Sequence, residues 1–210
     1  MSNPNQNLPV ELADVFEELH QHICWLHANW LIFEQLFATG EERVELLNEF
    51  APIFFRLCQD SFSDNVILSI ARLTDPPKSA GKDTLSFEQL ISKVDSAKYP
   101  DLRSTLSQQF ADLKTSCQSI RNVRNCRLAH NDLLISLSLA PNPLPDILKD
   151  EVDDVLRRIR EFMNVVWAYF NPDSELGYDV IMSNDGEAIV AALEKAKKYR
   201  EISRQRYGGI

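Results

Sequence analysis

The first forty residues carry one long apolar pattern with the period of an α-helix, and this pattern limits the fold more than any other feature. Its apolar residues recur every three or four positions, so they share one face of a helix. They are Leu12, Phe16, Leu19, Ile23, Leu26, Trp30, Phe33 and Phe37. Pro9 suits the first turn and Gly40 suits the end. The pattern therefore predicts a helix over residues 9–39.

Similar segments follow this one along the rest of the chain. Only six glycines occur in 210 residues, and long periodic segments with few turn signals are typical of helices. Further helices are expected at residues 41–74 with a bend near Pro52, at 86–94 after a capping box of Ser86 and Gln89, and at 100–139, 146–170 and 185–204. A polar loop is expected at residues 78–83 and a short extended link at 177–182.

These segments predict an all-α protein. We expect a single-domain helical bundle over residues 1–210, built from long antiparallel helices. Its core would lie within residues 9–170, and residues 171–210 would form a C-terminal helical extension. No strand pattern persists long enough to build a sheet. A chain of 210 residues is long enough for one helical domain with a hydrophobic core.

The overall charge and the absence of targeting signals narrow the partners. A net charge of −9 and a pI near 5.0 argue against indiscriminate binding to a polyanion, so no DNA partner is predicted. No apolar run approaches the roughly 20 residues of a membrane span. Residues 1–8 contain neither the basic cluster nor the apolar block of a secretory signal. We therefore expect a cytoplasmic protein with no membrane partner.

Positive charge is nevertheless concentrated in parts of the sequence. Between Lys114 and His130 there are four basic residues and no acidic residue, and further basic clusters lie at 157–160 and 195–206. One interpretation is that these clusters are solvated faces interleaved with acids such as Glu161. The other is a focused positive cleft on an acidic body. The sequence leaves both open.

The cysteines and histidines predict no metal or cofactor. The four cysteines are widely spaced, and none belongs to a paired motif, so we expect buried apolar thiols. They are Cys24, Cys58, Cys117 and Cys126. His20, His22 and His27 share the first predicted helix, with no zinc-binding spacing around them. We expect them to be histidines of the helix surface.

Arg124 is an anomaly in the helix expected at residues 100–139. The apolar residues that define one face of that helix are Leu113, Cys117, Ile120 and Leu128. Arg124 falls inside the same arc of the helix, as does Asn131. Arginine is rarely buried without a partner. A structural ion pair, or a side chain whose charged end reaches water, is therefore one interpretation.

The residues after Arg124 suggest another interpretation. Asn125 follows it directly, and His130 comes six positions later, before Asn131 and Asp132. This pattern resembles the signature of the HEPN superfamily, in which an Arg and a polar residue precede a His by a few positions. Members of that superfamily are all-helical, and many are metal-independent ribonucleases.

Other segments between Trp30 and Tyr169 make the resemblance more specific. In order they look like the abortive-infection U-type, or AbiU-like, branch of the superfamily. These segments are Trp30 with Phe33 and Phe37, residues 42–48, residues 51–55 and residues 70–76.

The resemblance implies a catalytic group made of Arg124, Asn125 and His130. Arg124 would bind the scissile phosphate of RNA, because a guanidinium can hold a phosphate with two hydrogen bonds. His130 would transfer protons, which suits a side chain whose ordinary pKa is about 6.5, and Asn125 would orient both. The implied substrate-binding residues are Arg121, Arg127, Asn131 and Asp132.

Helix geometry limits this arrangement. In one straight α-helix, Arg124 and His130 would point about 120° apart and lie about 9 Å apart along the axis. Either the helix ends or bends near His130, or a second copy of the chain completes the site. HEPN-like proteins commonly form homodimers whose motifs face a shared cleft. Arg127, three residues from His130, is the alternative partner of that histidine.

Two functions from different classes therefore follow. The first is a metal-independent endoribonuclease of a phage-defence or toxin-type system. The second is a HEPN-like helical module without nuclease activity that binds a nucleotide or a protein partner in a defence system. An antitoxin or a nucleotidyltransferase is a candidate partner of the protein in either case. Fold membership does not decide between them, because function depends on the site.

Overall fold

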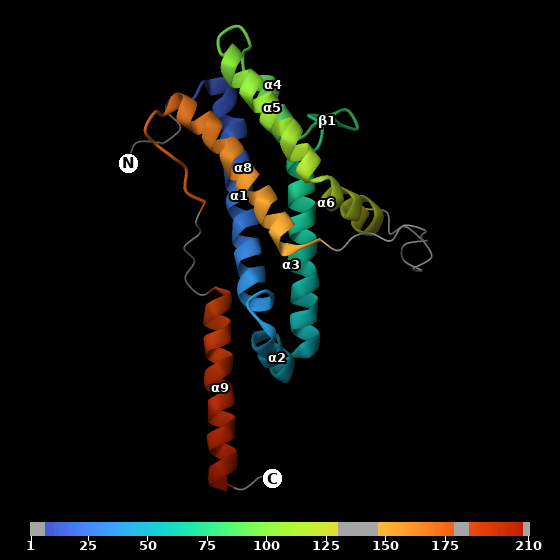
Figure 1. Cartoon of the computed structure of the whole chain (residues 1–210), viewed down its shortest axis with the longest axis vertical. Coiled ribbons are helices and arrows are strands. Elements are labelled where there is room, and N and C mark those ends of the chain that lie inside the picture. The colour runs from blue at the N-terminus through green and yellow to red at the C-terminus, as the bar shows by residue number, and fades with distance from the viewer. Residues whose placement is uncertain (1–6, 130–146, 179–184, 208–210) are drawn as a thin grey trace. The chain divides into compact units, whose positions relative to one another are not determined.

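The computed structural model describes residues 7–129, 147–178 and 185–207 (Figure 1), and they are predominantly helical. The helices are α1 (Val10–Phe37), α2 (Glu41–Phe50), α3 (Pro52–Leu73), α4 (Phe87–Lys93), α5 (Pro100–Ser116), α6 (Gln118–Val123), the π-helix η2 (Arg124–Ala129), α8 (Lys149–Phe170) and α9 (Gly186–Tyr207). Two short strands of the described residues, β1 (Lys78–Ser79) and β2 (Lys82–Asp83), pair in a small sheet. The expected all-α fold is confirmed.

The chain divides into two compact units. The first contains Met1–His27 and Val66–Asp179, and the second contains Ala28–Asn65 and Val180–Ile210. The boundaries fall inside α1 and inside α3. The expected single domain over residues 1–210 stays a prediction.

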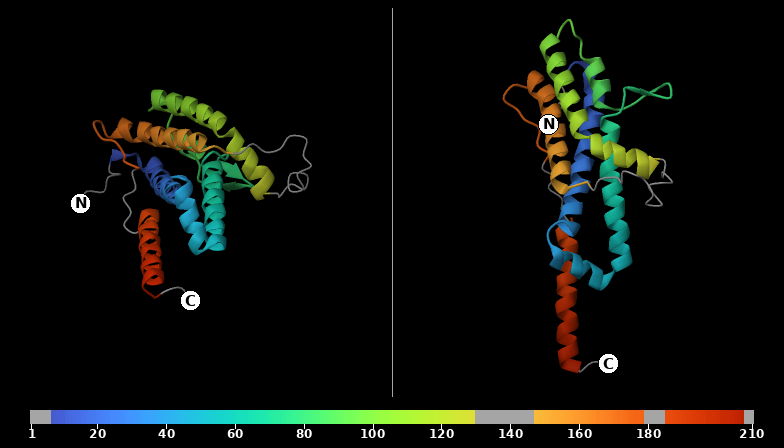
Figure 2. Two further views of the ribbon diagram at one scale, coloured as in Figure 1. Left: turned by 60° about the horizontal axis from the view of Figure 1, so that its bottom comes forward. Right: turned by 45° about the vertical axis from the view of Figure 1, so that its right-hand side comes forward.

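The core of the first unit is made by the first part of α1 together with α4, α5 and α8. Helices α5 and α8 lie side by side (Figures 1 and 2). Phe162 of α8 is 1% exposed, and its ring centroid lies 4.4 Å from that of Phe87 in α4. Phe16 of α1 stacks on Trp167 of α8, with ring centroids 6.1 Å apart. These aromatic contacts join three helices around one apolar centre.

The second unit has a smaller core in which α2 packs against α9. Its fully buried members come from α1, α2, α3 and α9, and they are Leu36, Leu46, Leu47, Phe55 and Val190. Polar contacts line the same packing. Glu49 of α2 lies 2.9 Å from Lys197 of α9, and the guanidinium of Arg200 lies 4.0 Å from the centre of the Phe50 ring.

Most predicted helices are confirmed. The first helix begins and ends close to the predicted residues. Its apolar face is buried from Leu12 to Trp30, whereas Phe33 and Phe37 are half-buried. Pro52 separates α2 from α3, as expected, because its ring cannot continue a helix interior. The Ser86 hydroxyl accepts a hydrogen bond from the backbone N–H of Gln89 at 3.3 Å, so it caps α4.

The segment expected to be a polar loop is a short hairpin. Lys78 pairs with Asp83 and Ser79 with Lys82 in an antiparallel ladder. The two residues between the strands, Ala80 and Gly81, have φ values of 50° and 79°. Such values suit a type I′ turn, which follows the twist of a hairpin. The segment predicted as a polar loop is therefore exposed, as its polar residues suggest, but it is paired as a hairpin.

The cysteine and histidine predictions hold only in part. Cys117 is buried, and burial raises the pKa of its thiol to about 12, whereas the other three cysteines are half-buried. His22 is exposed as expected, but His27 is buried. His20 and His27 share a helix face, where the rings of both lie near Tyr178, with centroids 5.2 and 5.6 Å away.

Within the described part of the chain, none of the helices has the length and apolarity that a membrane span requires. The extended link expected at residues 177–182 lies largely outside the described residues.

Candidate functional site

The helix that carries the Arg124 motif is not the continuous one that the sequence predicts. It consists of α5, α6 and η2, and Figure 2 shows that α6 turns away from the axis of α5. Near the break, the hydroxyls of Thr115 and Ser116 donate to the carbonyls four residues earlier, at 3.1 and 3.2 Å. Such side-chain bonds compete with the helix and bend it. The bend directs the motif away from α5.

Arg121 fastens α6 to the end of α3. Its Nη1 donates to the carbonyl oxygen of Ala71 at 2.9 Å and to the Thr74 hydroxyl at 2.7 Å, and its Nη2 donates to Asp75 at 3.0 Å. A basic side chain at a helix C-terminus satisfies its last carbonyls and suits its dipole. These bonds give Arg121 a structural role. Its predicted contact with substrate stays a prediction.

Arg124 meets the same carboxylate from the other side. Its Nη2 lies 3.5 Å from Asp75 Oδ2, and its Nη1 donates to the side-chain oxygen of Asn125 at 2.8 Å. The Arg124 side chain is 28% exposed and that of Asp75 is 22% exposed. The charged residue that was expected on the apolar face thus has an anionic partner and a hydrogen bond to Asn125, whereas the orienting role of Asn125 in catalysis stays a prediction. We call Arg121, Asp75 and Arg124 the Arg–Asp–Arg cluster.

Replacing Asp75 with asparagine is expected to lower the free energy of unfolding by about 1–2 kcal/mol, because two partly buried arginines lose their shared anion. Urea unfolding measures this value. Asp60→Asn is the matched control, since Asp60 forms an exposed pair with Arg56 at 3.2 Å and should cost less than about 0.5 kcal/mol. Equal losses in the two variants would contradict the role given to Asp75.

The remaining motif residues divide into two groups. Arg127 is exposed in η2, and its predicted roles stay predictions. His130, Asn131 and Asp132 lie outside the described residues. Because residues 124–129 form a π-helix, the angle expected for a straight α-helix does not apply over them. Single π-helical turns occur frequently at functional sites.

A cavity of about 270 Å³ borders the Arg–Asp–Arg cluster. It is lined by His22 of α1, by Ser69, Arg72, Leu73 and Asp75 at the end of α3, and by Thr84 and Leu85 after β2. Asp75 therefore belongs to both the cavity and the cluster. Sequence reasoning assigned no role to Asp75 or to the cavity. The signal was there in part, since residues 70–76 were among the family-like segments.

The basic clusters outside the motif have acidic partners. Arg157 binds Asp154 and Glu161, and Arg158 donates to Asp154 at 2.7 Å. In the second unit, Lys197 pairs with Glu49, as described above. These pairs favour the interpretation of solvated faces interleaved with acids. Among the residues that the structure describes, no three His, Cys, Asp or Glu side chains gather as metal ligands would.

Comparison with known protein families decides the family. A protein-family model described as AbiU2, of the HEPN type, matches residues 9–188. The chain belongs to the AbiU2 family. The matched range holds most of this AbiU2 protein, including the whole Arg–Asp–Arg cluster, the motif from Arg121 to Asp132 and the cavity. No curated protein and no solved structure matches the chain.

Proposed function

We propose that this AbiU2 protein is a metal-independent endoribonuclease of a phage-defence or toxin-type system. Cleavage would proceed by attack of a ribose 2′-hydroxyl on the adjacent phosphate. The 2′ oxygen forms a bond to phosphorus, the 5′ oxygen of the next nucleotide leaves with a proton, and a 2′,3′-cyclic phosphate remains. This route needs a proton acceptor, a proton donor and positive charge beside the phosphate, and no metal.

The observation that carries the proposal is that the Arg124 guanidinium is held by neighbouring side chains and is still accessible to a ligand. Asp75 and Asn125 orient its guanidinium, yet the side chain keeps 28% of its exposure. Its 3.5 Å contact with Asp75 is longer than the roughly 2.7–2.9 Å of a strong charged hydrogen bond. An incoming phosphate can therefore take this donor at little cost. A preorganised donor of this kind stabilises the charge of the transition state.

His130 is the proton-transfer residue in this proposal, and Arg127 is an additional phosphate contact. A second copy of the chain would complete the site in a shared cleft, as homodimers do in HEPN-like proteins. The family assignment supports the coarser part of this proposal, a HEPN-type role in abortive infection or RNA cleavage. The proposal includes an antitoxin or nucleotidyltransferase partner that holds the activity in check.

One observation favours the second candidate, an inactive module that binds a nucleotide or a protein. Asp75 is already ion-paired with both Arg121 and Arg124, as it would be in a purely structural cluster. The two candidates differ in one property: only the nuclease needs the 2′-hydroxyl of its nucleic-acid ligand.

The test is cleavage of a mixed RNA pool by the wild-type chain in EDTA, beside DNA of the same sequences. The nuclease is expected to cut RNA alone and to leave 2′,3′-cyclic phosphate ends. Arg124→Ala, purified in the same way, shows whether a contaminant is responsible. Cleavage of DNA as well as RNA, or activity that EDTA abolishes, would contradict the proposed route.

A further inference from the structure

We propose that the cavity beside Asp75 is a nucleobase-binding subsite that sets which base lies next to the cleaved phosphate. This inference rests on the proposed function, because it treats Arg124 as the phosphate-binding residue. It assigns a ligand to a cavity that the Arg124 motif does not include.

The size of the cavity suits one base. Its volume is about 270 Å³, close to the lower end of the roughly 300–1,000 Å³ that is usual for small-molecule pockets. A cavity of this size has room for one nucleobase. The walls come from α1, from the end of α3 and from the segment after β2, so three parts of the chain shape the cavity.

The residues that line the cavity offer the two kinds of contact that a base needs, which are surface for its flat ring and hydrogen bonds for its edge. Leu73 and Leu85 provide apolar surface for the flat ring, and the exposed guanidinium of Arg72 can stack on it. His22, exposed on α1, adds a second flat group. The Thr84 hydroxyl donates to the carbonyl of Pro76, which leaves its oxygen able to accept a hydrogen bond from the edge of a base.

The position of the cavity matches the reach of one nucleotide. Asp75 lines the cavity and also holds Arg124 through Oδ2. A phosphate on Arg124 and a base in the cavity would thus be separated by about one side chain. Single-stranded RNA is recognised in this way, with bases turned out of the stack and held individually.

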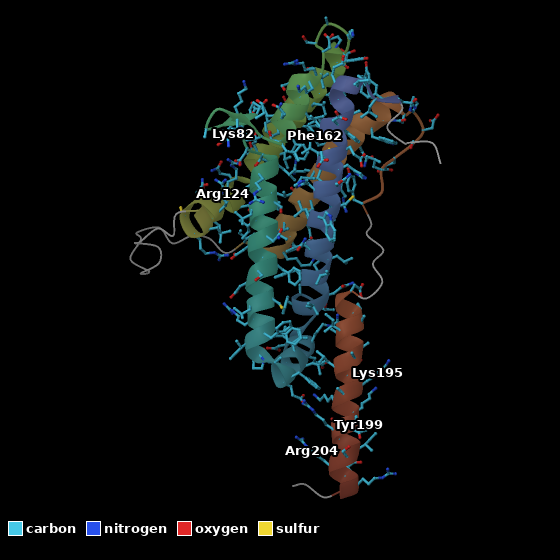
Figure 3. The ribbon with its side chains drawn as sticks, turned by 180° about the vertical axis from the view of Figure 1, so that it is seen from behind. Lys82, Arg124, Phe162, Lys195, Tyr199 and Arg204 are labelled. Atoms are coloured by element: carbon cyan, nitrogen blue, oxygen red, sulfur yellow. The ribbon has the colours of Figure 1, made fainter. Side chains whose placement is uncertain are left out.

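Basic residues of the hairpin extend the surface that holds Arg124 and the cavity. Figure 3 shows Lys82 in the hairpin and Arg124 on the same side of the α3 C-terminal end. Lys78 and Lys82 are exposed, and the Lys78 pair with Asp83 is long, at 3.9 Å. Lysines at this position suit the phosphate of a neighbouring nucleotide. The RNA strand would therefore run from Arg124 past the cavity to the hairpin.

The test measures binding of the four nucleoside 3′-monophosphates to the wild-type chain by ligand-observed NMR. None of them can be cleaved, so the result does not depend on nuclease activity. One nucleotide is expected to bind best, and inorganic phosphate alone should displace it only weakly. Leu85→Trp, which fills the cavity, and His22→Ala, which alters an exposed wall, should each weaken binding about tenfold.

Gln21→Ala is the matched control, because Gln21 is an exposed neighbour of His22 that does not line the cavity. It should bind like the wild type. The subsite is overturned if all four nucleotides bind alike, if none binds, or if inorganic phosphate binds as tightly as they do. It is also overturned if neither Leu85→Trp nor His22→Ala changes binding. RNA that stays intact while one nucleotide binds in the cavity would remove the nuclease proposal and leave the subsite standing.

Discussion

Replacing Arg124 with alanine is expected to lower the rate of RNA cleavage by about 10²–10³-fold, the usual loss when one preorganised donor to a developing anion is removed. The fold should survive, since Arg124 is partly exposed and Arg121 still binds Asp75 at 3.0 Å. The rate is measured in EDTA on one labelled RNA, with helix content checked by circular dichroism.

Two further variants make this result specific. Arg124→Lys keeps the charge but loses the planar pair of donors, so it should recover only part of the activity. Arg56→Ala removes an exposed arginine that is also paired with an aspartate, and it should cleave like the wild type. Full activity in Arg124→Ala would return this residue to the role of a structural ion pair.

Replacing Arg121 with alanine is expected to lower the free energy of unfolding by about 2–3 kcal/mol, because hydrogen bonds to a charged group each contribute about 1.5–3 kcal/mol before solvent exposure reduces them. The variant removes three hydrogen bonds between α6 and the end of α3. It also leaves Asp75 with Arg124 alone. Urea unfolding measures the change.

The Arg121 variant is expected to reduce cleavage as well, since α6 then loses its attachment to α3 and Arg124 loses its fixed position. Arg56→Ala again provides the comparison, with an expected loss below about 0.5 kcal/mol. If Arg121→Ala is as stable as Arg56→Ala, the Arg–Asp–Arg cluster does not hold the motif in place.

The helices were predictable because their signals are local. The spacing from Leu12 to Trp30, the ring of Pro52 and the cap at Ser86 each act within one or two turns of the chain. The bend after α5 also has a local signal, because the hydroxyls of Thr115 and Ser116 bond to backbone carbonyls beside it and such bonds often accompany a bend. Periodicity alone does not reveal it, because these residues are common on helix surfaces.

The site depends on contacts between distant residues, which a single sequence does not display. Arg121 of α6 and Asp75, which follows the end of α3, are 46 positions apart in the sequence. The pattern placed Arg124 on an apolar face, but it could not supply the carboxylate that meets it there. The contact between His27 and Tyr178 is another case, since the ring that packs near the histidine belongs to a residue much later in the sequence.

The most direct test of the account is the cleavage rate of wild type and His130→Ala on the same RNA in EDTA. We predict that the wild type leaves 2′,3′-cyclic phosphate ends and that the variant is slower by about 10²–10⁴-fold, the range for losing a general acid or base. Cleavage that persists at the wild-type rate in His130→Ala would contradict the proposed role of His130 and place any nuclease activity outside the Arg124 motif.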